Sequence, residues 1–207
     1  MEIVKKVYDT QFYDNKKILI TGGTGTLGNI LTDYLLNNTK CKKICIFSRD
    51  EFKQHQMKLK FKNNERDNKE DVLRFFIGDI RDAARIQYAC KNIDIVFHTA
   101  ALKQVDAIEY NPMEAIKTNI LGTQNVIMGC IENNVNQLIG ISTDKCVAPV
   151  NLYGATKLCL EKLIISAYEY SGEKLKTCVL RYGNVVGSRG SVVPIFLNQK
   201  EKGEFTV

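Results

Sequence analysis

Short apolar runs rich in β-branched residues alternate along the chain with longer stretches in which apolar residues recur at helical spacing. The first run, KILIT, precedes a glycine turn and then Leu27, Ile30, Leu31 and Leu35, which would share one face of a helix. The same alternation repeats along the chain. It is typical of βαβ units, whose right-handed crossovers build a parallel sheet. We therefore predict an α/β fold, a doubly wound parallel sheet of the Rossmann type with helices over both faces.

The individual elements follow from this pattern. Strands are expected at Lys17 to Thr21, Lys43 to Phe47, Arg74 to Gly78, Asp94 to Thr99, Gln137 to Ser142 and Lys176 to Arg181. After the helix that follows the glycine turn, further helices are expected at Arg49 to Lys62, Asp82 to Cys90, Met113 to Asn133 and Leu152 to Tyr170. The last stretch predicts a loop, a helix from about Pro194 and the start of another strand.

The turn after the first strand, TGGTGTLG, carries Gly22, Gly25 and Gly28 at three-residue intervals, with Thr24 among them. Glycines at these positions let the backbone turn tightly and approach a pyrophosphate, which binds N–H groups at the start of the next helix. Because the turn lies between a strand and a helix, it predicts a dinucleotide cofactor rather than a plain glycine turn.

The end of the second strand distinguishes NADP from NAD. NAD-binding domains usually place an Asp or Glu there to bind the ribose hydroxyls. Here the strand KICIF is followed by Ser48 and Arg49, a small hydroxyl and a cation. NADP is therefore predicted, with Arg49 against its 2′-phosphate, while Asp50 and Glu51 begin the next helix.

Two further segments follow strand ends, where ligands bind in sheets of this kind. GDIRD offers Asp79 and Ile80 at the adenine end, and TAALK puts Ala100 and Ala101 where a bulky side chain would block the dinucleotide. Lys103, in the second segment, is predicted to contact the cofactor and the substrate. Both segments are therefore assigned to the cofactor crevice.

Residues 142–157, STDKCVAPVNLYGATK, are the predicted catalytic segment. YGATK places Tyr153 and Lys157 four residues apart, hence on one face of a helix. A nearby ammonium and a positively charged nicotinamide ring both favour the phenolate. Tyr153 can then accept a proton from a sugar hydroxyl while hydride leaves the carbon that bears this hydroxyl. Asp144 and Lys145 add a carboxylate and an amine just upstream.

The composition restricts the possible partners. The chain has 207 residues, 44% hydrophobic and 25% charged, which suits one globular core. Neither a membrane span nor a signal peptide is indicated, so a cytoplasmic protein without a membrane partner is predicted. The net charge is +6, but the lysines are mixed with acids. Nucleic acid is therefore not expected, and the positive field suits a phosphorylated small ligand.

Neither a metal site nor a disulfide framework is predicted. The 7 cysteines contain no CxxC pair, and they are interpreted as small buried apolar side chains. Of the two histidines, His55 and His98, His98 ends a strand beside the crevice but has no paired carboxylate or Cys at ligand spacing. We expect His98 to pack in the core or behind the site.

Taken together, TGxxGxxG, HTAALK and YxxxK resemble the extended short-chain dehydrogenase/reductases. The likeness continues through FSRDE, FFIGDIRD, EYNPMEAIKTNILGTQNVI, STDK, NLYGATK and RYGNVVGSRGSVVP. With these segments the chain is similar to the inverting UDP-N-acetylglucosamine 4,6-dehydratases of pseudaminic acid biosynthesis. The resemblance covers the chain from about Lys16 onward.

The resemblance implies a reaction on a UDP-sugar. Tyr153 would deprotonate the hydroxyl on sugar carbon 4 as hydride passes to NADP. Lys145 would then remove the hydrogen on carbon 5, and Asp144 would protonate the hydroxyl leaving carbon 6. Thr143 would hydrogen-bond the keto oxygen. Hydride would return to carbon 6, water would be lost, and carbon 5 would be inverted.

The resemblance also implies substrate contacts and assembly. Four residues are placed to meet the substrate or to order the site: Lys103, Asn119, Asn184 and Arg189. Self-association into a homo-oligomer is expected through the long helices. The domain organisation would be an N-terminal extension at 1–15 and an NADP-binding Rossmann-type domain at 16–207, within which 182–207 starts the substrate region.

Two alternatives stay open. A nucleotide-sugar 4-epimerase on the same scaffold needs Tyr153 but neither Asp144 nor Lys145. Members of the family it resembles continue well past Val207, so the C-terminal substrate-binding region is expected to be truncated. The second alternative is therefore a non-catalytic, cofactor-binding module.

Overall fold

The computed structural model describes residues 10–62, 72–185, 196, 199–200 and 203. Arg189 lies outside these residues, as does almost all of the helix expected from about Pro194. Of the predicted N-terminal extension, the described part forms a 3₁₀ turn, η2 (Thr10–Tyr13).

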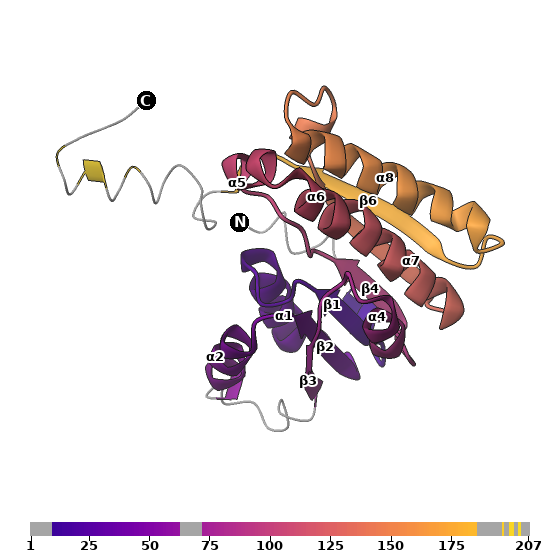
Figure 1. The fold of residues 1–207 in the computed structure, drawn as a ribbon. Helices are drawn as coiled ribbons and strands as arrows, with labels where there is room; N and C mark the ends of the chain where they lie inside the picture. The colour runs from indigo at the N-terminus through magenta and orange to yellow at the C-terminus, as the bar shows by residue number, and fades with distance from the viewer. Residues whose placement is uncertain (1–9, 63–71, 186–195, 197–198, 201–202, 204–207) are drawn as a thin grey trace, which may run out of the picture.

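Six parallel strands form one sheet in the order β3-β2-β1-β4-β5-β6 (Figure 1). They are β1 (Lys17–Thr21), β2 (Lys43–Ser48), β3 (Leu73–Ile77), β4 (Ile95–His98), β5 (Gln137–Thr143) and β6 (Lys176–Tyr182). Each predicted strand is confirmed, with its ends displaced by no more than one residue. The strand order reverses between β1 and β4, which places a crevice at the carboxyl ends of the strands.

Helices connect successive strands. They are α1 (Thr26–Asn38), α2 (Glu51–Lys62), α4 (Ala83–Ala89), α5 (Val105–Tyr110), α6 (Pro112–Ala115), α7 (Gly122–Glu132) and α8 (Leu152–Tyr170). Two short segments complete the described elements, the π-helical η3 (Ile116–Leu121) and the 3₁₀ turn η4 (Asp144–Cys146). The long helix predicted at Met113 to Asn133 is thus α6, η3 and α7 in succession, and α5 was not predicted.

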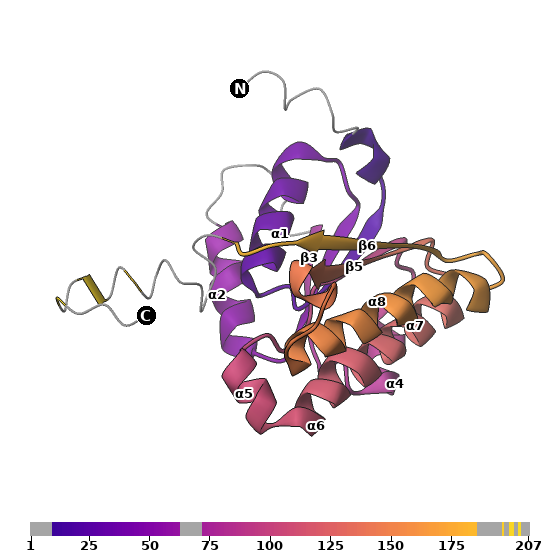
Figure 2. The ribbon, with the colours of Figure 1, turned by 90° about the horizontal axis from the view of Figure 1, so that it is seen from above.

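The core has two halves, one on each face of the sheet. Alternate strand residues such as Ile18 and Ile20 pack against Leu35 of α1 and Phe61 of α2. The intervening residues, with Leu19 among them, pack against α4, α7 and α8. Figure 2 shows α7 and α8 side by side along one face of β5 and β6. This two-sided burial confirms the doubly wound fold.

Helices were predicted over both faces of the sheet, but within the described residues one face of β6 is left uncovered. Val179 packs toward the buried core of α7 and α8, whereas Cys178, Leu180 and Tyr182 point to the opposite face and are exposed. Because β6 is also the edge of the sheet, it is the least enclosed strand. The position matters for the site, since Tyr182 ends the strand at the cavity.

The prediction that the cysteines are buried holds for five of the seven. The buried ones are Cys41, Cys45, Cys90, Cys130 and Cys146, whereas Cys159 and Cys178 are exposed. The latter two lie on an outer face of α8 and on the uncovered face of β6, which apolar sequence context does not reveal. In the part of the chain that the structure describes, no helix is long and apolar enough to cross a bilayer.

Candidate active site

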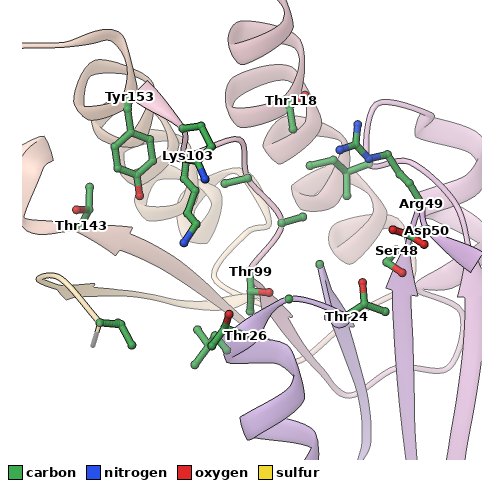
Figure 3. A pocket seen from close by; sticks show the side chains of 18 of the residues that line it. Thr24, Thr26, Ser48, Arg49, Asp50, Thr99, Lys103, Thr118, Thr143 and Tyr153 are labelled. Carbon is green, nitrogen blue, oxygen red and sulfur yellow. The ribbon is translucent and has the colours of Figure 1, made fainter. Parts of the chain in front are cut away.

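A cavity of about 900 Å³ lies at the carboxyl ends of all six strands. Each strand contributes its last residue or one that follows it: Gly22, Ser48, Gly78, Thr99, Thr143 and Tyr182. Figure 3 shows Tyr153, Lys103 and Thr143 gathered at one end, and Ser48, Arg49 and Asp50 at the other. The cavity is therefore elongated, with one end rich in proton-transfer groups and the other in charged groups.

The glycine turn at the cavity floor needs glycine for two reasons. Gly22 has a φ of +67°, and a Cβ there would lie 2.8 Å from the backbone of Ala100. A Cβ on Gly28 would lie 2.3 Å from the carbonyl oxygen of Gly23, so Gly28 packs α1 against the turn and does not line the cavity. Gly22, Thr24 and Gly25 do line it.

Helix α1 presents its N-terminus to this floor. Its N-cap, Gly25, has no side chain that could occupy the first N–H groups, and Thr26 begins the helix at the cavity wall. Uncapped N–H groups at a helix start bind anions well, because the helix dipole adds to their hydrogen bonds. The turn can therefore hold a pyrophosphate.

A buried glutamine, Gln54, fixes the end of β2 by hydrogen bonds. Gln54 donates from Nε2 to the carbonyl oxygen and hydroxyl of Ser48, at 3.1 and 3.0 Å, and to the carbonyl oxygen of Phe76. The Ser48 hydroxyl proton is left for a ligand. Arg49 follows with a half-exposed side chain, and Lys53 of α2 lines the same end while paired with Asp50.

Asp79 balances the positive charge at this end. Its carboxylate accepts two hydrogen bonds from the Arg81 guanidinium, and Arg49 lies 3.7 Å away. Burial would raise the pKa of Asp79, but the hydrogen bonds and charge of Arg81 outweigh it and the pKa is lowered. Arg81 also pairs with Glu114. Among these groups, Arg49 therefore has the longest ion-pair contact with a carboxylate, and its positive charge is the most available to a ligand.

Tyr153 and Lys157 lie on one face of α8, but at different depths. Asn151 caps the helix by accepting from the Gly154 N–H at 2.9 Å, which places Tyr153 in the first turn and at the cavity. Lys157 is only 4% exposed. Burial lowers the pKa of Lys157 to about 8, opposed by the charge of Glu161.

The residues of this chain raise the pKa of Tyr153. Burial is the main cause, the neighbouring Tyr182 adds to it, and a hydrogen bond with Thr143 opposes it. The residues of this chain therefore hold Tyr153 as a neutral phenol. A base at this position needs further positive charge from a bound ligand.

Asp144 and Lys145 follow β5 on the turn η4. The Nζ of Lys145 donates to Oδ1 of Asp144 at 3.2 Å and to Oδ1 of Asn184 at 2.9 Å. The hydroxyl of Thr143 donates to the same Asp144 oxygen at 2.9 Å. Hydrogen bonds from Thr143 and then Lys145 lower the pKa of Asp144. Lys145 lines the cavity, whereas Asp144 is not among the lining residues and lies beside it as the partner of Lys145 in an ion pair, with a hydrogen bond between acid and base.

Comparison with known proteins places this chain in a family. Residues 18–207 match the family described as polysaccharide biosynthesis protein. The chain belongs to that family, a branch of the extended short-chain dehydrogenase/reductases. Both the recognised motifs and the Rossmann-type fold agree with this membership.

Named relatives include two kinds of enzyme. The inverting UDP-N-acetylglucosamine 4,6-dehydratase of Campylobacter jejuni subsp. jejuni serotype O:23/36 (strain 81-176) is 54% identical over 185 residues, 89% of this chain and 53% of the relative. The UDP-glucose 4-epimerase of Rickettsia rickettsii (strain Sheila Smith) is 46% identical over 195 residues, 92% of this chain and 55% of the relative. The chain thus spans about half the length of these relatives.

Among solved structures, Pen from Bacillus thuringiensis superposes with a TM-score of 0.88 at 43% identity. The match covers 95% of this chain and 59% of that structure. The fold and the family are therefore shown by both sequence and structure.

Asn119, expected either to meet the substrate or to order the site, is not among the residues that line the cavity. It is fully buried, and its side chain bonds the Leu102 N–H at 2.8 Å, the Leu102 carbonyl at 2.9 Å and the Thr156 hydroxyl at 3.1 Å. It therefore orders the site by joining η3 to the loop after β4 and to α8. The π-helical turn, a common feature of functional sites, is where this side chain enters the core.

His98 continues this buried chain of hydrogen bonds. The Thr123 hydroxyl donates to the Asn119 carbonyl, so it must accept from Nε2 of His98, and Thr21 donates to Nδ1 at 2.8 Å. Burial lowers the pKa of His98 to about 3, with Lys157 contributing. His98 is thus a neutral structural residue that ties β4 to β1 and α7, as expected.

Several residues of the cavity were not singled out from the sequence. They are Thr26, Lys53, Thr118, Tyr182 and Gly183. Lys53 could have been found, because a helix that starts at Arg49, as expected from the sequence, would put Lys53 one turn later on the same face. In the structure the helix begins at Glu51. Tyr182 and Gly183 follow the sixth strand, so the strand-end rule that identified Asp79 applies to them as well.

Proposed function

We propose that this protein takes part in an NADP-retaining dehydration of a UDP-sugar, converting UDP-N-acetylglucosamine to a UDP-4-keto-6-deoxy-hexosamine with inversion at carbon 5. The observation that carries the proposal is the Asp144–Lys145 ion pair beside the cavity that Tyr153 lines. An oxidoreductase of this fold needs Tyr153 and Lys157 alone. A carboxyl and an amine held together at the same cavity supply the acid and base that an elimination requires. The product would serve surface polysaccharide or glycoprotein synthesis in the cytoplasm.

The cavity fits NADP. The glycine turn and the uncapped start of α1 suit the pyrophosphate, and Ala100 and Ala101 leave room for the dinucleotide. Ser48, Arg49 and Lys53 suit a 2′-phosphate, whereas no carboxylate directly ends β2 to favour a free ribose hydroxyl. When bound, the cofactor accepts hydride from carbon 4, returns it to carbon 6, and lends positive charge near Tyr153.

Tyr153 acts first in the proposed reaction. Its phenolate removes the proton from the hydroxyl on carbon 4 while that carbon loses hydride, and a ketone forms. Thr143, within hydrogen-bond reach of the phenol, is placed to hydrogen-bond the ketone oxygen. The ketone acidifies the hydrogen on carbon 5, which makes the next step possible.

Lys145 and Asp144 then remove water. Transfer of one proton along their 3.2 Å hydrogen bond turns the ion pair into a neutral amine and a neutral acid, with no proton taken from solvent. Desolvation by a bound sugar favours this neutral form, because burial penalises both charges. Lys145 takes the proton from carbon 5, and Asp144 gives its proton to the oxygen leaving carbon 6. Hydride returns to carbon 6, and carbon 5 takes a proton from solvent on the face opposite Lys145, as inversion requires. Tyr153 gives the proton from the carbon 4 hydroxyl back to solvent, so the balance is the loss of one water.

A 4-epimerase is the second candidate. The Rickettsia rickettsii relative at 46% identity carries that name, and Tyr153 with Lys157 suffices for oxidation and re-reduction at carbon 4. Asp144 and Lys145 would then be a structural ion pair. The two candidates differ in their product, because an epimerase gives an isomer of unchanged mass.

The direct test is product analysis with purified protein, NADP and UDP-N-acetylglucosamine. We expect a 4-keto-6-deoxy sugar nucleotide, lighter than the substrate by one water, with no net accumulation of reduced nicotinamide. Steady accumulation of reduced nicotinamide would indicate a simple dehydrogenase instead.

Titration of the UDP-sugar onto the 207-residue chain tests the alternative that the chain is a non-catalytic, cofactor-binding module. Cofactor binding without sugar binding would mark this chain as a cofactor-binding module.

Arg49→Ala tests the cofactor assignment. Loss of the charge-assisted hydrogen bonds to a 2′-phosphate is expected to weaken NADP binding about tenfold to a hundredfold and to change NAD binding little. Titration calorimetry with both cofactors measures this. Lys58→Ala, an exposed lysine on the same helix as Lys53 but outside the cavity, is the control and should bind both as before. Equal losses for NAD and NADP would contradict the assignment.

A further inference from the structure

A polar cluster with one half-exposed member, Arg181, lies behind the Asp144–Lys145 pair and takes no part in the chemistry proposed above. It consists of Cys146, Glu161 and Arg181. Cys146 is fully buried and Glu161 is 3% exposed. The Cys146 thiol donates to Oε1 of Glu161 at 2.9 Å and lies 2.8 Å from the carbonyl oxygen of Thr143. The cluster thus touches the turn that carries the acid and the base.

Arg181 completes the cluster from the end of β6. Its Nε donates to Oε1 of Glu161 at 2.8 Å and its terminal nitrogen donates to Oε2 at 2.6 Å, a two-point contact with a planar carboxylate. This contact holds the Glu161 pKa well below its usual range despite the burial of the carboxylate. Arg181 comes three residues before Asn184, which accepts from Lys145. The strand end that orients Lys145 is therefore anchored to Glu161.

Glu161 also belongs to the helix that carries the redox pair. It follows Lys157 by four residues and Tyr153 by eight, so all three share one face of α8. The backbone of Lys145 packs against the start of the same helix, since a Cβ on Gly154 would lie 2.3 Å from the Lys145 carbonyl oxygen. One carboxylate therefore links α8, the turn η4 and the end of β6.

We propose that Glu161 is a positioning residue for the elimination of water. Through the Cys146 thiol it fixes the turn that carries Asp144 and Lys145, and through Arg181 it fixes the strand end that carries Asn184. The proposal rests on the dehydration proposed above. It deepens that proposal by assigning the alignment of the acid and base to a residue that touches neither the cavity nor the reacting atoms.

The proposal separates the two halves of the reaction. Oxidation at carbon 4 uses Tyr153, which α8 holds in place without Cys146. Elimination needs the turn η4 held at the right distance from the sugar. Loss of the thiol hydrogen bond should therefore slow elimination while leaving oxidation close to normal.

Cys146→Ala and Cys146→Ser are the variants that test this. In single-turnover measurements with the UDP-sugar, Cys146→Ala should slow loss of water about tenfold, as expected for one lost hydrogen bond to a charged group. Oxidation should stay within about threefold. Cys146→Ser keeps a donor to Glu161 and should recover most of the loss. Cys130→Ala is the matched control, because Cys130 is equally buried but lies on the core-facing side of α7.

Amide hydrogen exchange gives a readout that does not need turnover. Exchange in residues 143–147 should quicken at least about fivefold in Cys146→Ala and in Glu161→Gln, and not in Cys130→Ala or Cys146→Ser. If Cys146→Ala leaves exchange at this turn no faster than Cys130→Ala does, the positioning role is overturned. Equal slowing of oxidation and elimination in Cys146→Ala would overturn it as well. Absence of any dehydration, with the expected change in exchange, would refute the proposed function and leave the anchoring of the turn supported.

Discussion

Tyr153→Phe is expected to lower turnover of the UDP-sugar about a thousandfold, within the range that a lost acid–base group usually costs. The phenylalanine ring fills the same place at the start of α8, so the protein should stay folded and bind the cofactor as before. Only the oxygen that accepts the proton from the hydroxyl on carbon 4 is lost. Rate measurements with saturating cofactor, together with a cofactor titration, check both halves of this expectation.

Tyr168→Phe is the control for this substitution. Tyr168 lies on the same helix, is partly exposed and is outside the cavity, so its variant should react at the normal rate. A Tyr153→Phe variant with more than a tenth of the normal turnover would contradict the role assigned to the phenol.

Lys145→Ala is expected to stop the reaction after oxidation. Without the amine, no group of the turn takes the proton from carbon 5, and loss of water should fall about a thousandfold. Reduced nicotinamide should then accumulate to about one equivalent per site, which its absorbance measures. Asp144→Asn removes the acid instead and should also block loss of the hydroxyl from carbon 6.

Lys162→Ala provides the comparison for Lys145→Ala. It removes an exposed lysine of α8 away from the cavity and should change nothing. Normal turnover in both Lys145→Ala and Asp144→Asn would contradict the dehydratase proposal and favour the 4-epimerase, which needs neither residue.

Local patterns in the sequence were sufficient for the sheet and for most of the cavity. The strands are short apolar runs with clear ends, and the site residues follow those ends directly, as Ser48 and Thr143 do. Helix spacing alone placed Tyr153 and Lys157 on one face. These features depend on residues close together in the chain, which is why they could be predicted.

Other features depend on contacts between distant segments. The burial of Lys157 and Asn119, and the hydrogen bond from Cys146 to Glu161, arise where α8 meets η3 and η4, and no periodicity reveals them. The π-helical turn was read as ordinary helix, because its apolar spacing resembles that of the flanking helices.

The exposed face of β6 is another feature that the sequence of the strand alone does not predict. Its composition predicts burial on both sides, but whether a helix covers Leu180 depends on parts of the fold far from it in sequence. The raised pKa of Tyr153 is likewise set by burial and by Tyr182, a residue on another element.

In the proposed dehydration, hydride leaves carbon 4 and returns to carbon 6 as water is lost. This transfer can be followed with UDP-N-acetylglucosamine that carries deuterium on carbon 4. Nuclear magnetic resonance and mass analysis of the product should show the deuterium in a new methyl group at carbon 6 and the loss of one water. Deuterium still on carbon 4, in a product of unchanged mass, would contradict the claim and identify an epimerase.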